Sequence, residues 1–83
     1  MVYPVIIKNS FDEEVPVFLC DSEESAKDLL KQLYEEEVDI QVHENEWNLE
    51  YEISEDGYYA KIETNFYDGT NITEYMIGSV REI

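Results

Sequence analysis

Cysteine, histidine and positive charge are scarce in this sequence, and each scarcity excludes a class of protein. Cys20 is the one cysteine among the 83 residues, so no internal disulfide can form. A single histidine, His43, cannot complete a Cys/His zinc set with it. Packing of side chains must therefore hold the fold together, and we expect Cys20 to be a buried structural residue.

Long apolar runs and catalytic motifs are also missing. No segment approaches the roughly 20 apolar residues needed to span a bilayer, and residues 1–8 lack the basic start and apolar stretch of a secretory signal. Glycine-rich phosphate loops, Gly-x-Ser-x-Gly and His-Glu-x-x-His do not occur. We therefore expect a cytoplasmic protein without membrane contact that is not an enzyme, with no catalytic, cofactor-binding or metal-binding residues.

What the sequence does contain is enough apolar surface to fold. Hydrophobic residues make up 43% and aromatic residues 13%, including seven tyrosines, which is more than a disordered acidic tail carries. A chain of this length fits one domain, and folding buries only about 60% of the surface that the unfolded chain exposes. The sequence predicts a single acidic domain over residues 1–83 with a modest core.

Acidic residues dominate the charge. There are 21 Asp and Glu against 5 Lys and Arg, a net charge of −16, and residues 12–56 hold most of the acids with only two lysines. Phosphates repel such a chain, so direct binding to nucleic acid is disfavoured. Its acidic clusters lack the loop spacing of an EF-hand, so no calcium site is predicted. The charge instead indicates a binding protein with a positively charged partner.

One amphipathic helix is predicted over about residues 22–36. Apolar residues recur at helical spacing on one face, namely Ala26, Leu29, Leu30, Leu33 and Tyr34. Asp21 as N-cap, with Glu24 three residues later, has the form of a capping box. The three carboxylates of residues 35–37 are unfavourable at the negative end of a helix dipole, so the helix is expected to end there.

Strands are predicted on both sides of the helix, from apolar runs and from alternation of apolar and polar residues. They cover residues 2–8, 15–20, 38–43, 47–54, 58–67 and 72–80. The first two are expected to pair as a hairpin, and Asp68-Gly69 is a hairpin turn signal. This order predicts an α+β fold, an antiparallel sheet of five or six strands with one helix packed on one face.

The face opposite the helix is expected to show Glu50, Glu52 and Glu63 among tyrosines. Paired carboxylates act as general acid and base only where a pocket separates their pKa values. Strand alternation places Glu50 and Glu52 toward solvent, which favours a solvated face over a catalytic pair.

The charge pattern favours a nucleic-acid mimic, an inhibitor that occupies the basic groove of a DNA- or RNA-binding protein such as a nuclease. Duplex DNA presents about one negative charge per 1.7 Å of its axis. A stiff array of carboxylates can compete with DNA for the basic groove that binds those charges. Folding is expected to gather the mid-chain acids onto one continuous surface. The predicted partner-binding residues are Glu35, Glu36, Glu37, Asp39, Glu44, Glu46, Trp47, Glu50, Tyr51, Glu52, Glu55 and Asp56.

Two resemblances accompany these patterns. In size and charge the whole chain resembles phage-encoded inhibitors of host DNA enzymes, of the anti-restriction, anti-CRISPR and uracil-DNA glycosylase inhibitor types. That resemblance implies a DNA mimic but carries over no individual residue. Residues 17–30 join an apolar strand to the pattern Ser-Glu-Glu-x-Ala-x-x-x-Leu, which is similar to small Firmicutes and phage domains and supports a strand followed by a helix.

A second hypothesis belongs to another class, an accessory protein–protein interaction module whose acidity serves solubility. Its interface would be a patch of tyrosines with Trp47, or a free sheet edge, in a monomer or homodimer. Salt distinguishes the two hypotheses, because a charge array loses affinity as salt rises and an aromatic interface changes little.

Overall fold

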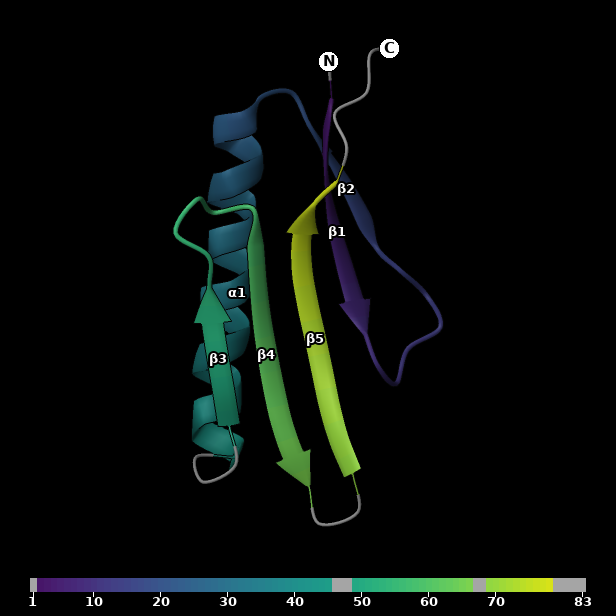
Figure 1. Ribbon diagram of the computed structural model, residues 1–83, viewed down its shortest axis with the longest axis vertical. Coiled ribbons are helices and arrows are strands. Elements are labelled where there is room, and N and C mark those ends of the chain that lie inside the picture. Colours follow the sequence, from purple (N-terminus) through teal and green to yellow (C-terminus); the bar gives the residue numbers. More distant parts are fainter. Residues whose placement is uncertain (1, 46–48, 67–68, 79–83) are drawn as a thin grey trace.

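A five-stranded antiparallel sheet carries one long helix on one of its faces (Figure 1). The computed structural model describes residues 2–45, 49–66 and 69–78, without the side chains of residues 44, 45 and 66. Its elements are β1 (Tyr3–Asn9), β2 (Val17–Cys20), α1 (Glu23–Asn45), β3 (Leu49–Ile53), β4 (Tyr59–Phe66) and β5 (Gly69–Ile77). The sheet order is β2-β1-β5-β4-β3, with antiparallel neighbours. The predicted α+β class is confirmed.

A hairpin and one long-range pairing build the sheet around β1. The expected hairpin with β2 is present, with Val5 opposite Phe18 and a hydrogen bond from Ile7 N–H to the Pro16 carbonyl at 3.0 Å. On its other side β1 pairs with β5, which brings the first and last strands together at the middle of the sheet. The other predicted strands correspond to β3, β4 and β5, and the ends of those predictions at residues 47, 48, 67, 79 and 80 lie outside the described residues.

The helix is the main departure from the sequence prediction. α1 is 23 residues long, so the expected end at residues 35–37 and the expected strand at residues 38–43 are both wrong. Glu37 and Gln41 lie one helical turn apart, both half-buried, and Gln41 Nε2 donates a hydrogen bond to Glu37 Oε1 at 2.9 Å. This pair, and the packing of Val38 against the core, continue the inner face of the helix past the acidic triplet.

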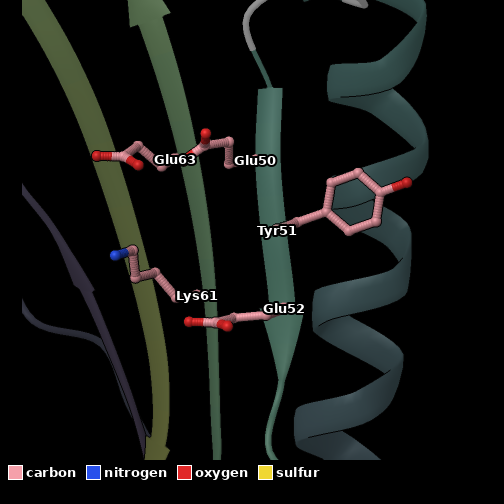
Figure 2. A pocket seen from close by; sticks show the side chains of 5 residues that line it. All are labelled: Glu50, Tyr51, Glu52, Lys61 and Glu63. Atoms are coloured by element: carbon pink, nitrogen blue, oxygen red, sulfur yellow. The ribbon is translucent and has the colours of Figure 1, made fainter.

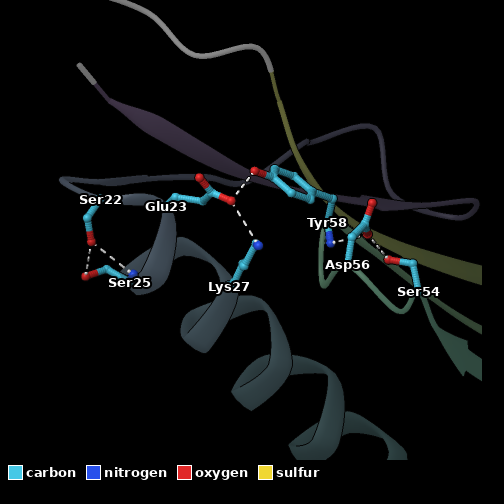
Figure 3. Close-up of polar contacts among 7 residues, drawn as sticks. All are labelled: Ser22, Glu23, Ser25, Lys27, Ser54, Asp56 and Tyr58. Atoms are coloured by element: carbon cyan, nitrogen blue, oxygen red, sulfur yellow. Dashed lines mark hydrogen bonds and ion pairs between the residues drawn. The ribbon is translucent and has the colours of Figure 1, made fainter.

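The N-terminus of α1 is capped by Ser22 and not by Asp21 (Figure 3). The Ser22 hydroxyl accepts a hydrogen bond from Ser25 N–H at 3.1 Å, and its carbonyl accepts one from Ala26 N–H at 3.0 Å. The predicted capping box of Asp21 and Glu24 is therefore wrong by one residue. A side-chain oxygen that accepts from the N3 amide satisfies one of the unpaired donors of the first turn.

The core lies between α1 and the central strands. Leu30 and Ala26 on the helix and Val5 on β1 are fully buried, and Ala60 and Ile62 of β4 pack into the same cluster. In Figure 1, α1 lies on the β3 and β4 side of the sheet and β2 lies at the other side. The sheet therefore has one face packed on the helix, one face that no other described element covers, and two edges with different surroundings.

Candidate binding surfaces

Alternation on β3 sends neighbouring side chains to opposite faces of the sheet. Tyr51 faces α1, where its ring centroid lies 6.5 Å from that of Tyr34, with the rings tilted by 59°. Glu50 and Glu52 therefore project from the face that α1 does not cover, as the alternation predicts (Figure 2). We call this uncovered side the open face.

The acids of the open face are mixed with lysine. Glu50 lies opposite Glu63, and Glu52 lies opposite Lys61, and these four residues line a shallow depression (Figure 2). On its β5 side, Lys61 lies opposite Glu74. A positive charge among the carboxylates weakens their combined field. The open face is therefore not an unbroken array of negative charge.

The outer side of α1 carries a longer row of exposed acids. We call it the acidic ridge, and it consists of Glu24, Asp28, Glu35, Glu36 and Asp39. Lys31 reaches Glu35 at 3.9 Å, but both side chains are well exposed, so this ion pair neutralises the ridge only weakly. Glu37 is not part of the ridge, because it is half-buried on the inner side of the helix.

The structure distributes the predicted partner-binding residues over several places. They lie on the ridge (Glu35, Glu36, Asp39), on the open face (Glu50, Glu52), in the β3–β4 turn (Glu55, Asp56) and on the side facing the helix or the sheet (Glu37, Tyr51). Glu46 and Trp47 lie outside the described residues, as does the side chain of Glu44. The ridge and the open face are on opposite sides of the molecule, so the described members do not form the one continuous surface expected from the sequence.

Asp56 shapes the turn between β3 and β4. Its Oδ1 accepts a hydrogen bond from the Ser54 hydroxyl at 2.7 Å and another from Tyr58 N–H at 3.0 Å (Figure 3). These two bonds hold the pKa of the Asp56 carboxyl below its usual value, and the bond from Ser54 contributes most. Gly57 follows with a φ of 77°, a conformation that favours glycine. Asp56 thus has a local structural role in addition to its charge.

Tyr58 joins this turn to the first turn of α1. Its hydroxyl donates a hydrogen bond to Glu23, whose Oε1 also lies 2.9 Å from Lys27 Nζ (Figure 3). Lys27 Nζ lies 4.7 Å from the centroid of the Tyr58 ring, a cation–π contact. The pKa of Glu23 is lowered, mainly by the hydrogen bond from Tyr58 and secondly by the contacts with Lys27. The pKa of Lys27 is raised, mainly by its hydrogen bond to Glu23. The three side chains fix the helix to the sheet. None of them pairs a nucleophile with a general base, so this cluster has a structural role.

The edge strand β2 is a surface that sequence reasoning did not single out. Its Val17, Phe18 and Leu19 are all exposed, and Cys20, expected to be buried, is half-buried. The sequence signal was present, because this run is apolar on both faces and has no charge. Local pattern alone does not say whether such a strand lies inside a sheet or at its edge.

Comparison with protein-family models, curated proteins and solved structures finds no match. Among the described residues, no group of three or more His, Cys, Asp or Glu side chains is arranged to hold a metal ion. The described part of the chain also contains no helix long and apolar enough to cross a membrane. The chain is thus a small acidic α+β domain whose candidate binding surfaces are the acidic ridge, the open face and the β2 edge.

Proposed function

We propose that this protein is an acidic inhibitor that mimics nucleic acid, and that the acidic ridge of α1 occupies the basic groove of a DNA- or RNA-binding protein such as a nuclease. The observation that supports the proposal is the row of exposed carboxylates along one side of a long helix. Two described cations lie beside the row, Lys31, which pairs weakly with Glu35, and Lys27, which pairs with Glu23 outside the ridge. A basic groove attracts such a row both during encounter and in the bound state.

The spacing of the ridge suits one nucleic-acid strand better than a duplex. From Glu24 to Asp39 the helix rises about 22 Å, at 1.5 Å per residue. Its five carboxylates therefore give roughly one charge per 5 Å, against one per about 3.4 Å for a single strand and 1.7 Å for both strands of duplex DNA. The ridge approaches the density of one strand, so the proposed target is a groove that follows a single backbone.

Attachment of the helix to the sheet makes the ridge a stiff array. Leu30 is fully buried against the sheet, and Glu23 binds Tyr58, the residue just before β4. A preorganised set of charges loses little conformational freedom on binding, which improves affinity for a fixed groove.

An aromatic interface has less support, because most of the tyrosines are already engaged inside the domain. Tyr34 and Tyr75 are buried, Tyr58 binds Glu23, and Tyr59 donates a hydrogen bond to Glu74 at 2.7 Å. Tyr51 is 51% exposed, and a single half-exposed tyrosine does not make a patch. The described residues thus favour charge over aromatic contact as the basis of recognition.

A capture experiment with a nucleic-acid competitor tests the proposal. The immobilised protein is exposed to lysate of its host at low salt, and bound proteins are challenged with a single-stranded DNA oligonucleotide and then with a step to physiological salt. A nucleic-acid mimic releases its target to the oligonucleotide, because both occupy one groove, and loses it as salt rises. A captured protein that resists both challenges would contradict the proposal.

Charge reversal of the ridge provides the matched comparison. The ridge variant carries Glu24→Lys, Asp28→Lys, Glu35→Lys and Asp39→Lys, and the control carries Asp12→Lys, Glu13→Lys, Glu52→Lys and Glu55→Lys. Both variants change the net charge equally, so only the position of the charges differs. Capture is expected to be abolished in the ridge variant and largely kept in the control. Equal loss in both would mean that net charge, and not the ridge, attracts the captured proteins.

A further inference from the structure

The two edges of the sheet differ in how they are protected. β3 carries Glu50 and Glu52 within five residues, and charged side chains on an edge strand discourage pairing with another chain. β2 consists of Val17–Cys20 and carries no charged residue. Val17 is 51% exposed and Leu19 is 66% exposed. An unprotected apolar edge of this kind is a template for a further strand.

The backbone of β2 offers the hydrogen-bonding groups that strand addition requires. Ile7 N–H donates to the carbonyl of Pro16, so Pro16 points toward β1. In an antiparallel ladder the direction alternates along the strand, which places the N–H and C=O groups of Val17 and Leu19 on the outer side. The sheet order puts no other described strand there. Two donors and two acceptors therefore line the outer edge.

The side chains beside this edge form a place for a partner's apolar residue. Val17 and Leu19 lie opposite Ile6 and Pro4 in the register, so all four project from the open face. Together with Val2 they line an apolar hollow of about 200 Å³. Since a cavity of about 150 Å³ accepts a benzene molecule, the hollow has room for one aliphatic or aromatic side chain.

Charge at both ends of β2 indicates what kind of strand fits. Asp12, Glu13 and Glu14 precede the strand and Asp21 follows it, and all four are exposed. In an antiparallel pair of two β2 strands, the acids before one strand lie beside those after the other, which disfavours a second copy of this chain. Lys or Arg residues on both sides of an apolar strand would instead complement these acids.

We propose that β2 binds an extended segment of a partner protein, one whose apolar residues alternate and whose two ends carry Lys or Arg. The segment adds to the sheet as a sixth strand, bonds to the backbone of Val17 and Leu19, and places one apolar side chain in the hollow. This surface is separate from the acidic ridge, so the inference does not depend on the proposed nucleic-acid mimicry.

A synthetic peptide tests the strand addition directly. The probe is Lys-Lys-Val-Thr-Val-Thr-Val-Lys-Lys, and binding is followed by NMR titration and by amide hydrogen exchange of the whole chain. We expect saturable binding with new exchange protection of the Val17 and Leu19 amides. A peptide with N-methyl groups on alternate backbone nitrogens loses the bonds to the edge, so its affinity should fall at least about tenfold. Equal binding of both peptides would overturn the proposal, as would a failure of the first to bind.

Two further comparisons test the position and the charge. Val17 and Ile40 are both 51% exposed, one on β2 and one on α1, so Val17→Lys and Ile40→Lys add the same charge to apolar positions of equal exposure. Val17→Lys should weaken peptide binding at least about tenfold and Ile40→Lys should leave it unchanged. A peptide with Glu in place of Lys should not bind. Equal binding of that peptide would refute charge complementarity.

The oligomeric state of the free protein tests the competing occupant. Sedimentation should show a monomer, and a dimer that Val17→Lys dissociates would show that a second copy occupies the edge. Circular dichroism of each variant establishes that it is folded. Should Val17→Lys fail to fold, the comparison of the N-methylated and unmodified peptides on the native chain still decides the outcome.

Discussion

Thr64 on β4 and Gln41 on α1 meet in the interior, where the buried Thr64 hydroxyl donates a long hydrogen bond of 3.4 Å to Gln41 Oε1. Gln41 in turn donates to Glu37 on the same side of the helix. The first half of the inner helix face is apolar and packs on apolar strand residues. The second half is mixed, because Val38 still packs against the core while Gln41 is hydrogen-bonded to Thr64 on the sheet.

Replacing Thr64 with valine tests how much this polar contact stabilises the fold. The substitution keeps the shape and removes the hydroxyl that donates to Gln41 Oε1, so we expect a loss of about 1 kcal/mol in the free energy of unfolding. The control is Thr70→Val, which removes a bond to Asn65 Oδ1 of 3.0 Å at a half-buried position and should cost less than about 0.5 kcal/mol. Urea denaturation measures both, and equal losses would show that the interior contact has no special weight.

The same contact explains why the sequence predicted a strand where the helix continues. Val38, Ile40 and Val42 alternate with polar residues, which fits a half-buried strand. In the same run Val38 and Val42 are four residues apart, which places them on one side of a helix, so the run also fits a helix whose inner face is partly polar. The deciding partner, Thr64, lies far along the chain, and local pattern contains no information about it.

Elements bounded by strong turn signals were predicted much better. Gly57 lies two residues before β4, and the strand predicted over residues 58–67 agrees with Tyr59–Phe66. Of the predicted Asp68-Gly69 turn, Asp68 lies outside the described residues, and Gly69 is already the first residue of β5. The candidate site was harder to predict, because it depends on which side of an element each acid lies and on which strands become edges. Those properties arise from long-range pairing, such as that of β1 with β5.

The helix cap provides a test between two adjacent candidates. Ser22→Ala removes the oxygen that accepts from Ser25 N–H and should destabilise the domain by about 1 kcal/mol. Asp21→Ala removes a charge near the positive end of the dipole and should cost only about 0.3 kcal/mol. Thermal unfolding of the two variants at equal salt measures the difference. A larger loss for Asp21→Ala would mean that the cap in solution is the one that the sequence predicted.

The hydrogen bond from Tyr58 to Glu23 has a consequence for acid stability. A carboxyl whose pKa is lower in the folded state than in the unfolded state stabilises the fold above its ordinary pKa, and that contribution is lost as pH falls through the folded value. Tyr58→Phe removes the largest cause of the shift, so the pKa of Glu23 should rise toward its usual value and the loss of stability in acid should become shallower. Carboxyl carbon NMR measures the titration. Tyr51→Phe, remote from Glu23, is the control and should leave the pKa of Glu23 unchanged.

Tyr59 and Tyr75 should titrate late in alkali, for different physical reasons. The pKa of Tyr59 is raised to about 12, mainly by its hydrogen bond to Glu74 and secondly by burial. The pKa of Tyr75 is also raised to about 12, mainly by burial and secondly by the negative charge of Glu37. The folded state thus holds these protons more tightly than the unfolded state, whose tyrosines titrate near 10.0. Their contribution to stability is complete below about pH 10 and is lost as pH rises toward about 12.

Phenolate absorbance separates the two causes. In Glu74→Gln the late step of Tyr59 should move toward the ordinary value while that of Tyr75 stays, because burial of Tyr75 does not depend on Glu74. Tyr59→Phe should remove one late step and Tyr75→Phe the other, which assigns the two transitions. If Glu74→Gln left both late steps in place, burial alone would account for Tyr59, and the bond from its hydroxyl to β5 would carry no part of the shift.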